Sequence, residues 1–206
     1  GIGDNTVIVF SWDNGPGLID VQPSGGSAGP WRGGFMTPPF EGSMRVPAIL
    51  RWRGTAPAGV STEEMLSCHD WYKTFAALAG ASDKVPTDRP MDGVDASKFL
   101  LGESEKTGRE TLIFFGPDGS LMSSKWRQMK AIMRYCDGVD KPILEAQFPM
   151  FFDLGSDPGE HYNLFGNKLD MTWMFAVAFQ VVGQWEQSVE KYPNIKPGTE
   201  DFKGYK

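Results

Sequence analysis

An acidic and an amide side chain stand together just after an apolar run near the start of the chain. Residues 7–10 read Val-Ile-Val-Phe, and Asp13, Asn14 and Gly15 follow after two more residues. Open α/β sheets bind ligands at the carboxyl ends of their strands, and glycine allows the chain to leave a strand sharply. Carboxylate and amide oxygens suit hard cations such as Ca²⁺ or Mg²⁺. We predict a divalent metal site that includes Asp13 and Asn14; a simple Asp-Asn-Gly turn is the alternative.

The segment that follows, residues 14–44, is rich in glycine and proline and shows little periodicity. It is too long for an ordinary connection, so we predict that it forms part of a binding site. Arg32, Phe35 and Thr37 are its candidate substrate-pocket residues. The guanidinium would orient the loop or an anion, the ring would form an apolar wall for an aryl group, and the hydroxyl would donate a hydrogen bond. Plain packing within the loop is the alternative for Phe35.

The charges of the chain restrict what it can bind. The 206 residues carry a net charge of −6 and show no cluster of lysine and arginine, which argues against a broad nucleic-acid surface. Any anionic substrate must therefore meet local cations. Glu41 and Arg45 are close enough in sequence for us to predict a structural salt bridge between them. We expect no membrane span, because no apolar run is long enough.

Hydrophobic patterns predict the elements that position these residues. Residues 6–11 form an apolar, β-branched run without alternation, which is typical of a strand buried in a parallel sheet. Residues 46–52 predict a second strand. Ser67 and Asp70 predict the start of a helix that ends at Gly80.

The second half of the chain changes to short strands separated by turn signals, which predicts a small antiparallel sheet. Gly-Pro-Asp-Gly at residues 116–119 marks one turn. The predicted strands lie at residues 110–116, 119–123, 126–135 and 150–154. A final helix at residues 168–190 should cover one face of this sheet. Its predicted buried face has apolar side chains at i+4 steps: Leu169, Trp173, Val177, Val181 and Trp185.

Further short motifs occur in a fixed order along the chain. Trp-Arg-Gly-Gly begins at Trp31, Glu-Gly-Ser-Met-Arg-Val-Pro at Glu41, and Ser-Cys-His-Asp-Trp-Tyr at Ser67. Met-Asp-Gly-Val-Asp begins at Met91, and Phe-Asp-Leu-Gly-Ser-Asp-Pro-Gly-Glu begins at Phe152. Together with the Asp-Asn-Gly strand, this ordered set resembles the sulfatase family of the alkaline-phosphatase-like superfamily. No single motif is decisive, but their order accounts for nearly all of the chain.

The resemblance implies an α/β fold class: the C-terminal part of an alkaline-phosphatase-like sheet plus a small α+β subdomain with an antiparallel sheet and a final helix. Residues 1–108 would be the C-terminal part of the catalytic α/β domain. Residues 109–206 would be the antiparallel-sheet subdomain with the terminal helix.

The resemblance also implies metal-dependent hydrolysis of a small-molecule sulfate ester, as in arylsulfatases, with Asp13 and Asn14 in a Ca²⁺ or Mg²⁺ site. Sulfatases carry a formylglycine nucleophile made from a Cys/Ser-x-Pro/Ala-x-Arg motif. Neither Cys68 nor Cys136 stands in such a motif. We therefore expect no catalytic residue here and no activity from the chain alone. The nucleophile would belong to an N-terminal part of the enzyme, in the same or a separate chain.

One family element is absent. Sulfatases have a lysine after a Gly-Gly pair that contacts the sulfate, whereas Gly33 and Gly34 are followed by Phe35 in a loop one residue longer. No residue can be assigned that role. Two alternatives stay open: a phosphomonoester, phosphodiester or phosphonate hydrolase of the same superfamily, and a non-catalytic binding or structural protein derived from such a segment.

Overall fold

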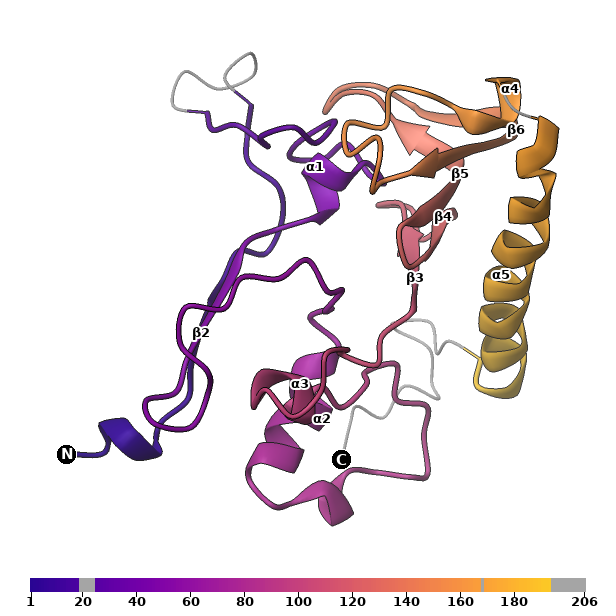
Figure 1. Cartoon of the computed structure of the whole chain (residues 1–206). Coiled ribbons are helices and arrows are strands. Elements are labelled where there is room, and N and C mark those ends of the chain that lie inside the picture. The colour runs from indigo at the N-terminus through magenta and orange to yellow at the C-terminus, as the bar shows by residue number, and fades with distance from the viewer. Residues whose placement is uncertain (19–24, 168, 194–206) are drawn as a thin grey trace.

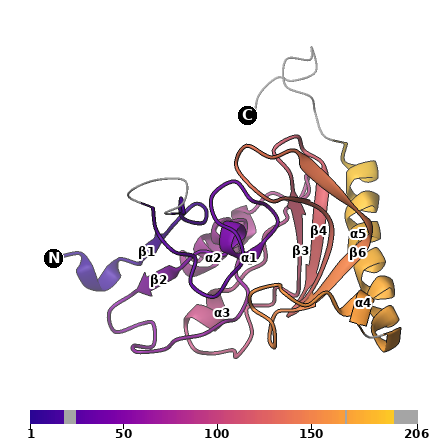
Figure 2. The same cartoon turned by 90° about the horizontal axis from the view of Figure 1, so that it is seen from above.

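The computed structural model describes residues 1–18, 25–167 and 169–193. Its described part contains a two-stranded ribbon, a helical segment, and a four-stranded sheet backed by a long helix (Figure 1). Figure 2 shows the ribbon and the four-stranded sheet on opposite sides, with the short helices α1, α2 and α3 between them. No helix among the described residues is long and apolar enough to cross a membrane.

The ribbon pairs β1 (Ile8–Ser11) with β2 (Ala48–Arg51), so the two strands predicted near these positions are confirmed. The pairing is antiparallel, with Ile8 opposite Arg51. Our prediction of a buried parallel strand is wrong for the described chain, because Phe10 in β1 is 55% exposed. An apolar run without alternation indicates that both faces of a strand are apolar, but it does not specify the direction of the neighbouring strand.

The helical segment comprises α2 (Asp70–Leu78), the short turn η2 (Ser82–Lys84) and α3 (Ser97–Leu100). The helix predicted after Ser67 is confirmed, and the chain turns at Gly80 with a φ of 68°. Asp70 is fully buried and accepts a hydrogen bond from the Ser67 backbone N–H at 2.7 Å. Its carboxylate also accepts a bond from Arg109 Nε at 2.8 Å, which fastens α2 to the segment that enters the sheet.

The four-stranded sheet confirms the predicted antiparallel subdomain. Its strands follow the chain order: β3 (Thr111–Phe115), β4 (Leu121–Trp126), β5 (Met129–Cys136) and β6 (Ile143–Asp153). All neighbouring pairs are antiparallel. The predicted turn between β3 and β4 is present, and the Gly119 N–H donates to the Gly116 carbonyl at 2.9 Å.

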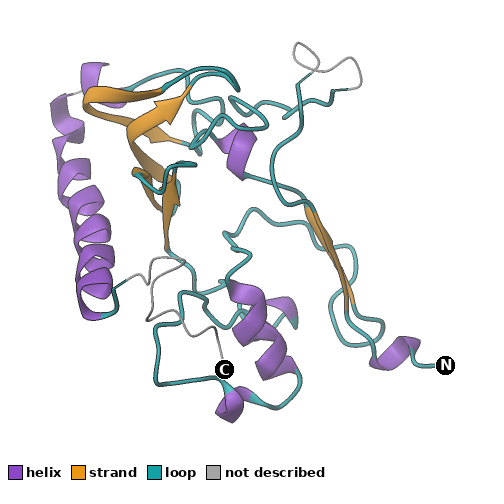
Figure 3. Ribbon diagram, turned by 180° about the vertical axis from the view of Figure 1, so that it is seen from behind, coloured by secondary structure: helices purple, strands orange, loops and turns teal. Residues whose placement is uncertain are grey.

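The long helix α5 (Trp173–Lys191) covers one face of this sheet, after α4 (Leu164–Asn167) and η3 (Leu169–Thr172) (Figure 3). Met174 and Val181 are its buried residues, whereas Trp173 is 44% exposed. The predicted role of Trp173 in the core is therefore wrong. Each i+4 step advances about 40° beyond a full turn, so a line of such steps drifts around the helix. The side chain of Leu169 lies outside the described residues.

Adjacent residues of β5 and β6 point to opposite faces of the sheet. Ala131 and Phe151 pack with Met174 of α5. Ile132 and Phe152 pack with Phe40, which immediately precedes α1 (Glu41–Met44). The loop predicted to carry the site is therefore packed against the sheet face opposite α5.

Candidate functional site

The loop between β1 and β2 forms a cavity of about 270 Å³ with the turn that follows β5. Arg32, Phe35 and Thr37 all line this cavity, so the structure brings the three candidate pocket residues together. The other side is formed by the turn, with Asp137 and Val139. Sequence reasoning missed Asp137, because nothing local indicates that a turn about a hundred residues downstream meets this loop.

The polar side chains that line the cavity already form hydrogen bonds within the protein. Arg32 Nη2 donates to Asp137 Oδ1 at 3.2 Å, and the Arg32 guanidinium lies 3.9 Å from the centre of the Phe40 ring. The Thr37 hydroxyl donates to the Gly34 carbonyl at 3.0 Å and accepts from the Gly34 N–H at 2.8 Å. The one donor of Thr37 is therefore used within the loop and not offered to a ligand. The Phe35 ring is 39% exposed.

Asp13 and Asn14 follow β1 and make local hydrogen bonds. Asp13 is exposed, and its Oδ1 accepts the Asn14 N–H at 2.9 Å. Asn14 is half-buried and donates from Nδ2 to the Gly15 carbonyl at 2.8 Å. No group of three or more His, Cys, Asp or Glu residues placed to hold a metal occurs among the residues the structure describes. The two oxygen-bearing side chains suit a hard cation, but they amount to part of a ligand shell, since Ca²⁺ takes about six to eight oxygens.

Backbone hydrogen bonds tie this strand end to the cavity loop. The Gly15 N–H donates to the Ser43 carbonyl at 2.9 Å, and the Phe35 N–H donates to the Pro16 carbonyl at 2.8 Å. A side chain at Gly15 would overlap the Gly42 carbonyl, so this close approach requires glycine. The candidate metal ligands and the candidate pocket loop are thus held together by the backbone.

Glu41 does not pair with Arg45, so that prediction is wrong. Glu41 lies 2.9 Å from Lys125 Nζ and 3.0 Å from Lys130 Nζ, both on the sheet. The same Lys130 Nζ lies 2.8 Å from Glu160 Oε1, and Glu160 Oε2 accepts the Glu41 backbone N–H at 2.7 Å. We call these four residues, Glu41, Lys125, Lys130 and Glu160, the buried charge cluster.

Arg45 is partly exposed and has other partners. It lies 3.5 Å from Glu63 and stacks over the Trp31 ring at 4.6 Å. Glu63 and Trp31 are both more than ten residues from Arg45 in the sequence, so the short spacing between Glu41 and Arg45 could not indicate these contacts.

The buried charge cluster fastens the start of α1 to β4 and β5. Lys125 and Lys130 are directly opposite each other on these strands, a placement that is destabilising unless an anion lies between them. Burial alone would raise the pKa of Glu41, but Lys130 and then Lys125 lower that pKa to about 2. Burial also lowers the pKa of the Lys125 ammonium, against the opposing effect of Glu41. The cluster therefore holds the cavity loop in place through paired charges.

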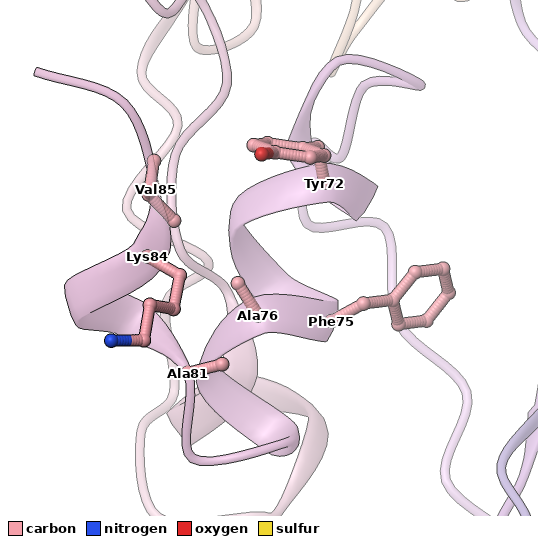
Figure 4. A pocket seen from close by; sticks show the side chains of 6 residues that line it. All are labelled: Tyr72, Phe75, Ala76, Ala81, Lys84 and Val85. Atoms are coloured by element: carbon pink, nitrogen blue, oxygen red, sulfur yellow. The ribbon is translucent and has the colours of Figure 1, made fainter.

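A second hollow, of about 380 Å³, lies between α2 and η2 (Figure 4). Its lining is largely apolar and includes one cation, Lys84, which pairs with Asp83 at 2.9 Å. The full lining is Tyr72, Phe75, Ala76, Ala81, Lys84 and Val85. Because this hollow has no convergent polar groups, we place the candidate site at the Arg32 cavity.

The architecture matches the C-terminal region of a class of solved hydrolases. The structure superposes on the PsFucS1 sulfatase from Pseudoalteromonas sp. with a TM-score of 0.82 and 28% sequence identity, covering 94% of this chain and 39% of that one. No model of a known protein family matches the chain.

Sequence relatives agree with the structural neighbour. The chain is 33% identical to the N-acetylgalactosamine-6-sulfatase of Canis lupus familiaris over 184 residues, covering 79% of this chain and 34% of the relative. It is 34% identical to the human arylsulfatase G over 180 residues, covering 77% of this chain and 33% of the relative. The chain belongs to the sulfatase family and corresponds to its C-terminal portion. It spans about a third of the length of these curated relatives.

Proposed function

We propose that this chain is the C-terminal part of a metal-dependent sulfuric ester hydrolase of the arylsulfatase type. In that enzyme it contributes Asp13 and Asn14 to the metal shell and the Arg32 loop to the substrate pocket. The observation that carries the proposal is the identity of 33% to a sulfatase across 79% of the chain. The backbone bonds between the end of β1 and the cavity loop support it, because they keep both contributions in one place.

Ca²⁺, or Mg²⁺, is the cation that the oxygens of Asp13 and Asn14 suit. When bound, it would neutralise developing charge on the ester oxygens. Asp13 is exposed and leaves one carboxylate oxygen outside its bond to Asn14, so it can turn to a cation without unfolding the loop. The remaining ligands and the formylglycine nucleophile would come from the N-terminal part of the enzyme, in the same or a separate chain.

A phosphoester or phosphonate hydrolase is not favoured. The solved phosphonate monoester hydrolase of Agrobacterium radiobacter shares the fold at a TM-score of 0.57, with 21% sequence identity. The relatives that exceed 30% identity are sulfatases.

Reconstitution tests the proposal. The 206-residue chain is mixed with a sulfatase N-terminal segment that carries the Cys/Ser-x-Pro/Ala-x-Arg motif converted to formylglycine. Hydrolysis of p-nitrophenyl sulfate is then followed with and without Ca²⁺. We expect no turnover from either part alone and Ca²⁺-dependent turnover from the mixture.

Asp13→Ala should abolish turnover by the mixture. The matched control is Asp4→Ala, which removes another exposed carboxylate, from the segment before β1. Turnover by the chain alone, retained in Asp13→Ala, would overturn both the partial-enzyme proposal and the role of Asp13. A mixture that folds together but stays inactive would favour a non-catalytic protein.

A further inference from the structure

Glu160 is completely buried and follows β6, far along the chain from Asp13 and Asn14. Its Oε2 accepts the backbone N–H of Glu41, 119 residues earlier, at 2.7 Å. We propose that Glu160 is a positioning residue for the proposed metal site. Acting through Glu41 and α1, it fixes where the two metal ligands lie. The inference rests on the proposed function, because it takes Asp13 and Asn14 as those ligands.

The first step is that Glu160 holds the start of α1 in two ways. One carboxylate oxygen bonds the Glu41 backbone, and the other lies 2.8 Å from Lys130 Nζ. Lys130 Nζ in turn lies 3.0 Å from the Glu41 carboxylate and donates to the Pro39 carbonyl. Hydrogen bonds to ionised groups are stronger than neutral ones, and burial strengthens them further. The start of α1 is therefore fixed relative to the four-stranded sheet.

The second step is that α1 touches the cavity loop on one side and the end of the ribbon on the other. The Gly42 N–H donates to the Arg32 carbonyl at 2.7 Å, and the Ser43 carbonyl accepts the Gly15 N–H at 2.9 Å. A side chain at Gly42 would overlap the carbonyl oxygens of Arg32 and Gly33. Because closely packed groups transmit displacement, a shift of α1 moves both neighbours.

The third step leads from Gly15 to the proposed ligands. Asn14 Nδ2 donates to the Gly15 carbonyl at 2.8 Å, and the Asn14 N–H donates to Asp13 Oδ1 at 2.9 Å. Both side chains are therefore oriented relative to the backbone of Gly15. Residues that orient metal ligands from outside the ligand shell usually change metal affinity by about 10–100-fold.

The backbone of Glu160 indicates that its carboxylate is what this position requires. Glu160 has a φ of 53°, in the left-handed region. This conformation is uncommon for residues other than glycine, asparagine and aspartate, and it lowers stability unless surrounding contacts impose it. Glycine would fit the backbone better but would leave Lys130 and the Glu41 N–H without this acceptor. The reach of the glutamate side chain therefore outweighs the local preference.

The test is a nuclear magnetic resonance titration of the isotope-labelled 206-residue chain with CaCl₂, following the backbone amides of Asn14 and Gly15. Glu160→Asp keeps the charge of the buried charge cluster but is one methylene group shorter, so it cannot reach both Lys130 and the Glu41 N–H. We expect the Gly15 amide resonance to shift even without Ca²⁺. The half-saturating Ca²⁺ concentration should rise by about tenfold, the lower end for residues that orient metal ligands.

A second variant and two controls separate positioning from stability. Gly42→Ala presses on the Arg32 carbonyl without changing a charge, so it should also raise the half-saturating Ca²⁺ concentration. It decides the test if Glu160→Asp does not fold. Met174→Ala removes a buried side chain on the opposite face of the sheet, and Glu110→Asp makes the same chemical change in an exposed ion pair. Both controls should keep the wild-type amide resonances and Ca²⁺ response.

The reconstituted enzyme gives a further readout. In hydrolysis of p-nitrophenyl sulfate by the mixture, Glu160→Asp should raise the Ca²⁺ requirement by about tenfold, while turnover at saturating Ca²⁺ returns toward the wild-type rate. A residue that only stabilised the fold would instead lower turnover at every Ca²⁺ concentration and leave the requirement unchanged.

The inference is overturned if folded Glu160→Asp keeps the wild-type Gly15 resonance and Ca²⁺ response, or if Met174→Ala changes them equally. It is also overturned if Glu160→Asp does not fold and Gly42→Ala leaves the Ca²⁺ response unchanged. Failure of the proposed function looks different. An inactive wild-type mixture refutes that function alone when the chain still binds Ca²⁺ and Glu160→Asp weakens the binding. A wild-type chain without any Ca²⁺ response refutes both.

Discussion

The β1–β2 ribbon and the four-stranded sheet are both antiparallel, yet they bury their apolar residues to very different extents. Phe151 and Phe152 of β6 are almost completely buried, each against a different layer. In the ribbon, Ile8, Phe10 and Ile49 are at least half exposed. A two-stranded ribbon has marginal stability in water, whereas a sheet of three or more strands covered by a helix can be stable by itself.

This difference in burial suggests different roles for the two regions: the sheet stabilises the fold, and the ribbon leads into the proposed metal ligands. The four-stranded sheet supplies a core and holds the cavity loop through the buried charge cluster. The ribbon leads into Asp13 and Asn14, the proposed metal ligands, but contributes little to the core. Apolar residues exposed on a strand mark a surface that another part of a protein can cover. We therefore expect substitutions in the sheet to change folding and substitutions in the ribbon to leave the isolated chain folded.

Replacing one phenylalanine in each region should give the largest contrast. Phe151→Ala creates a cavity between the sheet and α5, so we expect a loss of about 3–5 kcal/mol in the free energy of unfolding. Phe10→Ala should cost less than about 1 kcal/mol, because the ring is already exposed. Urea unfolding followed by tryptophan fluorescence measures both values. Similar losses for the two variants would show that the regions do not differ as described.

The buried charge cluster should give the next largest effect. Glu41→Gln leaves Lys125 and Lys130 facing each other without the carboxylate, and we expect a loss of about 3 kcal/mol at neutral pH. The pKa of Glu41 falls from its ordinary value of 4.5 to about 2 on folding. The stabilisation is therefore complete above about pH 4.5 and is lost as the pH falls toward about 2.

Unfolding measured at several pH values tests this linkage. The difference between wild type and Glu41→Gln should shrink steadily below about pH 4.5. Glu63→Gln is the control, since that carboxylate is 75% exposed and pairs with Arg45 at the surface. A difference that stays constant down to about pH 2 would contradict the assignment of the acid dependence to Glu41.

The face of α5 gives a smaller and more local test. Met174→Ala should cost about 2 kcal/mol, toward the low end for methionine truncation because alanine also favours the helix. Trp173→Ala, one position earlier on the exposed side, should cost less than about 1 kcal/mol. A larger loss for Trp173 would restore the helix face that i+4 spacing predicted.

The sequence predicted the sheet well because its signals are local. The glycines of the turn at residues 116–119 and the short apolar runs on each side define β3 and β4 without any distant information. The buried face of α5 was misplaced because we followed apolar side chains at steps of four residues. A helix has 3.6 residues per turn, so five side chains at such steps do not stay on one face. Local patterns therefore predicted where elements lie better than which way they face.

The partners of charged residues could not be read from the sequence. Glu41 bonds lysines 84 and 89 residues away, and Arg32 bonds an aspartate 105 residues away. Nearness in sequence favoured Arg45 as the partner of Glu41, but the fold brings Lys125 and Lys130 to the same place. A lysine at position 130 within an apolar strand was the one signal that a buried anion must exist nearby.

Asp13→Ala should have the smallest effect on folding and thereby distinguishes a metal ligand from a turn residue. Asp13 is exposed and accepts one bond, from the adjacent Asn14 N–H, so we expect the free energy of unfolding without Ca²⁺ to change by less than about 0.5 kcal/mol. With Ca²⁺ in excess, the wild-type chain should unfold at a slightly higher temperature, because a ligand that binds the folded state stabilises it. The increase should be small, since two side-chain oxygens form only part of a shell.

Calorimetry with and without CaCl₂ makes the comparison. The Ca²⁺-dependent increase should vanish in Asp13→Ala and persist in Asp4→Ala, whose carboxylate is also exposed but lies before β1. The opposite pattern, in which Asp13→Ala loses more than about 1 kcal/mol without Ca²⁺ and wild type shows no response to the ion, would mean that the Asp-Asn-Gly segment is a structural turn. The segment after β1 would then contribute to stability. The contrast in stability between the ribbon and the four-stranded sheet would no longer hold at Asp13 and Asn14.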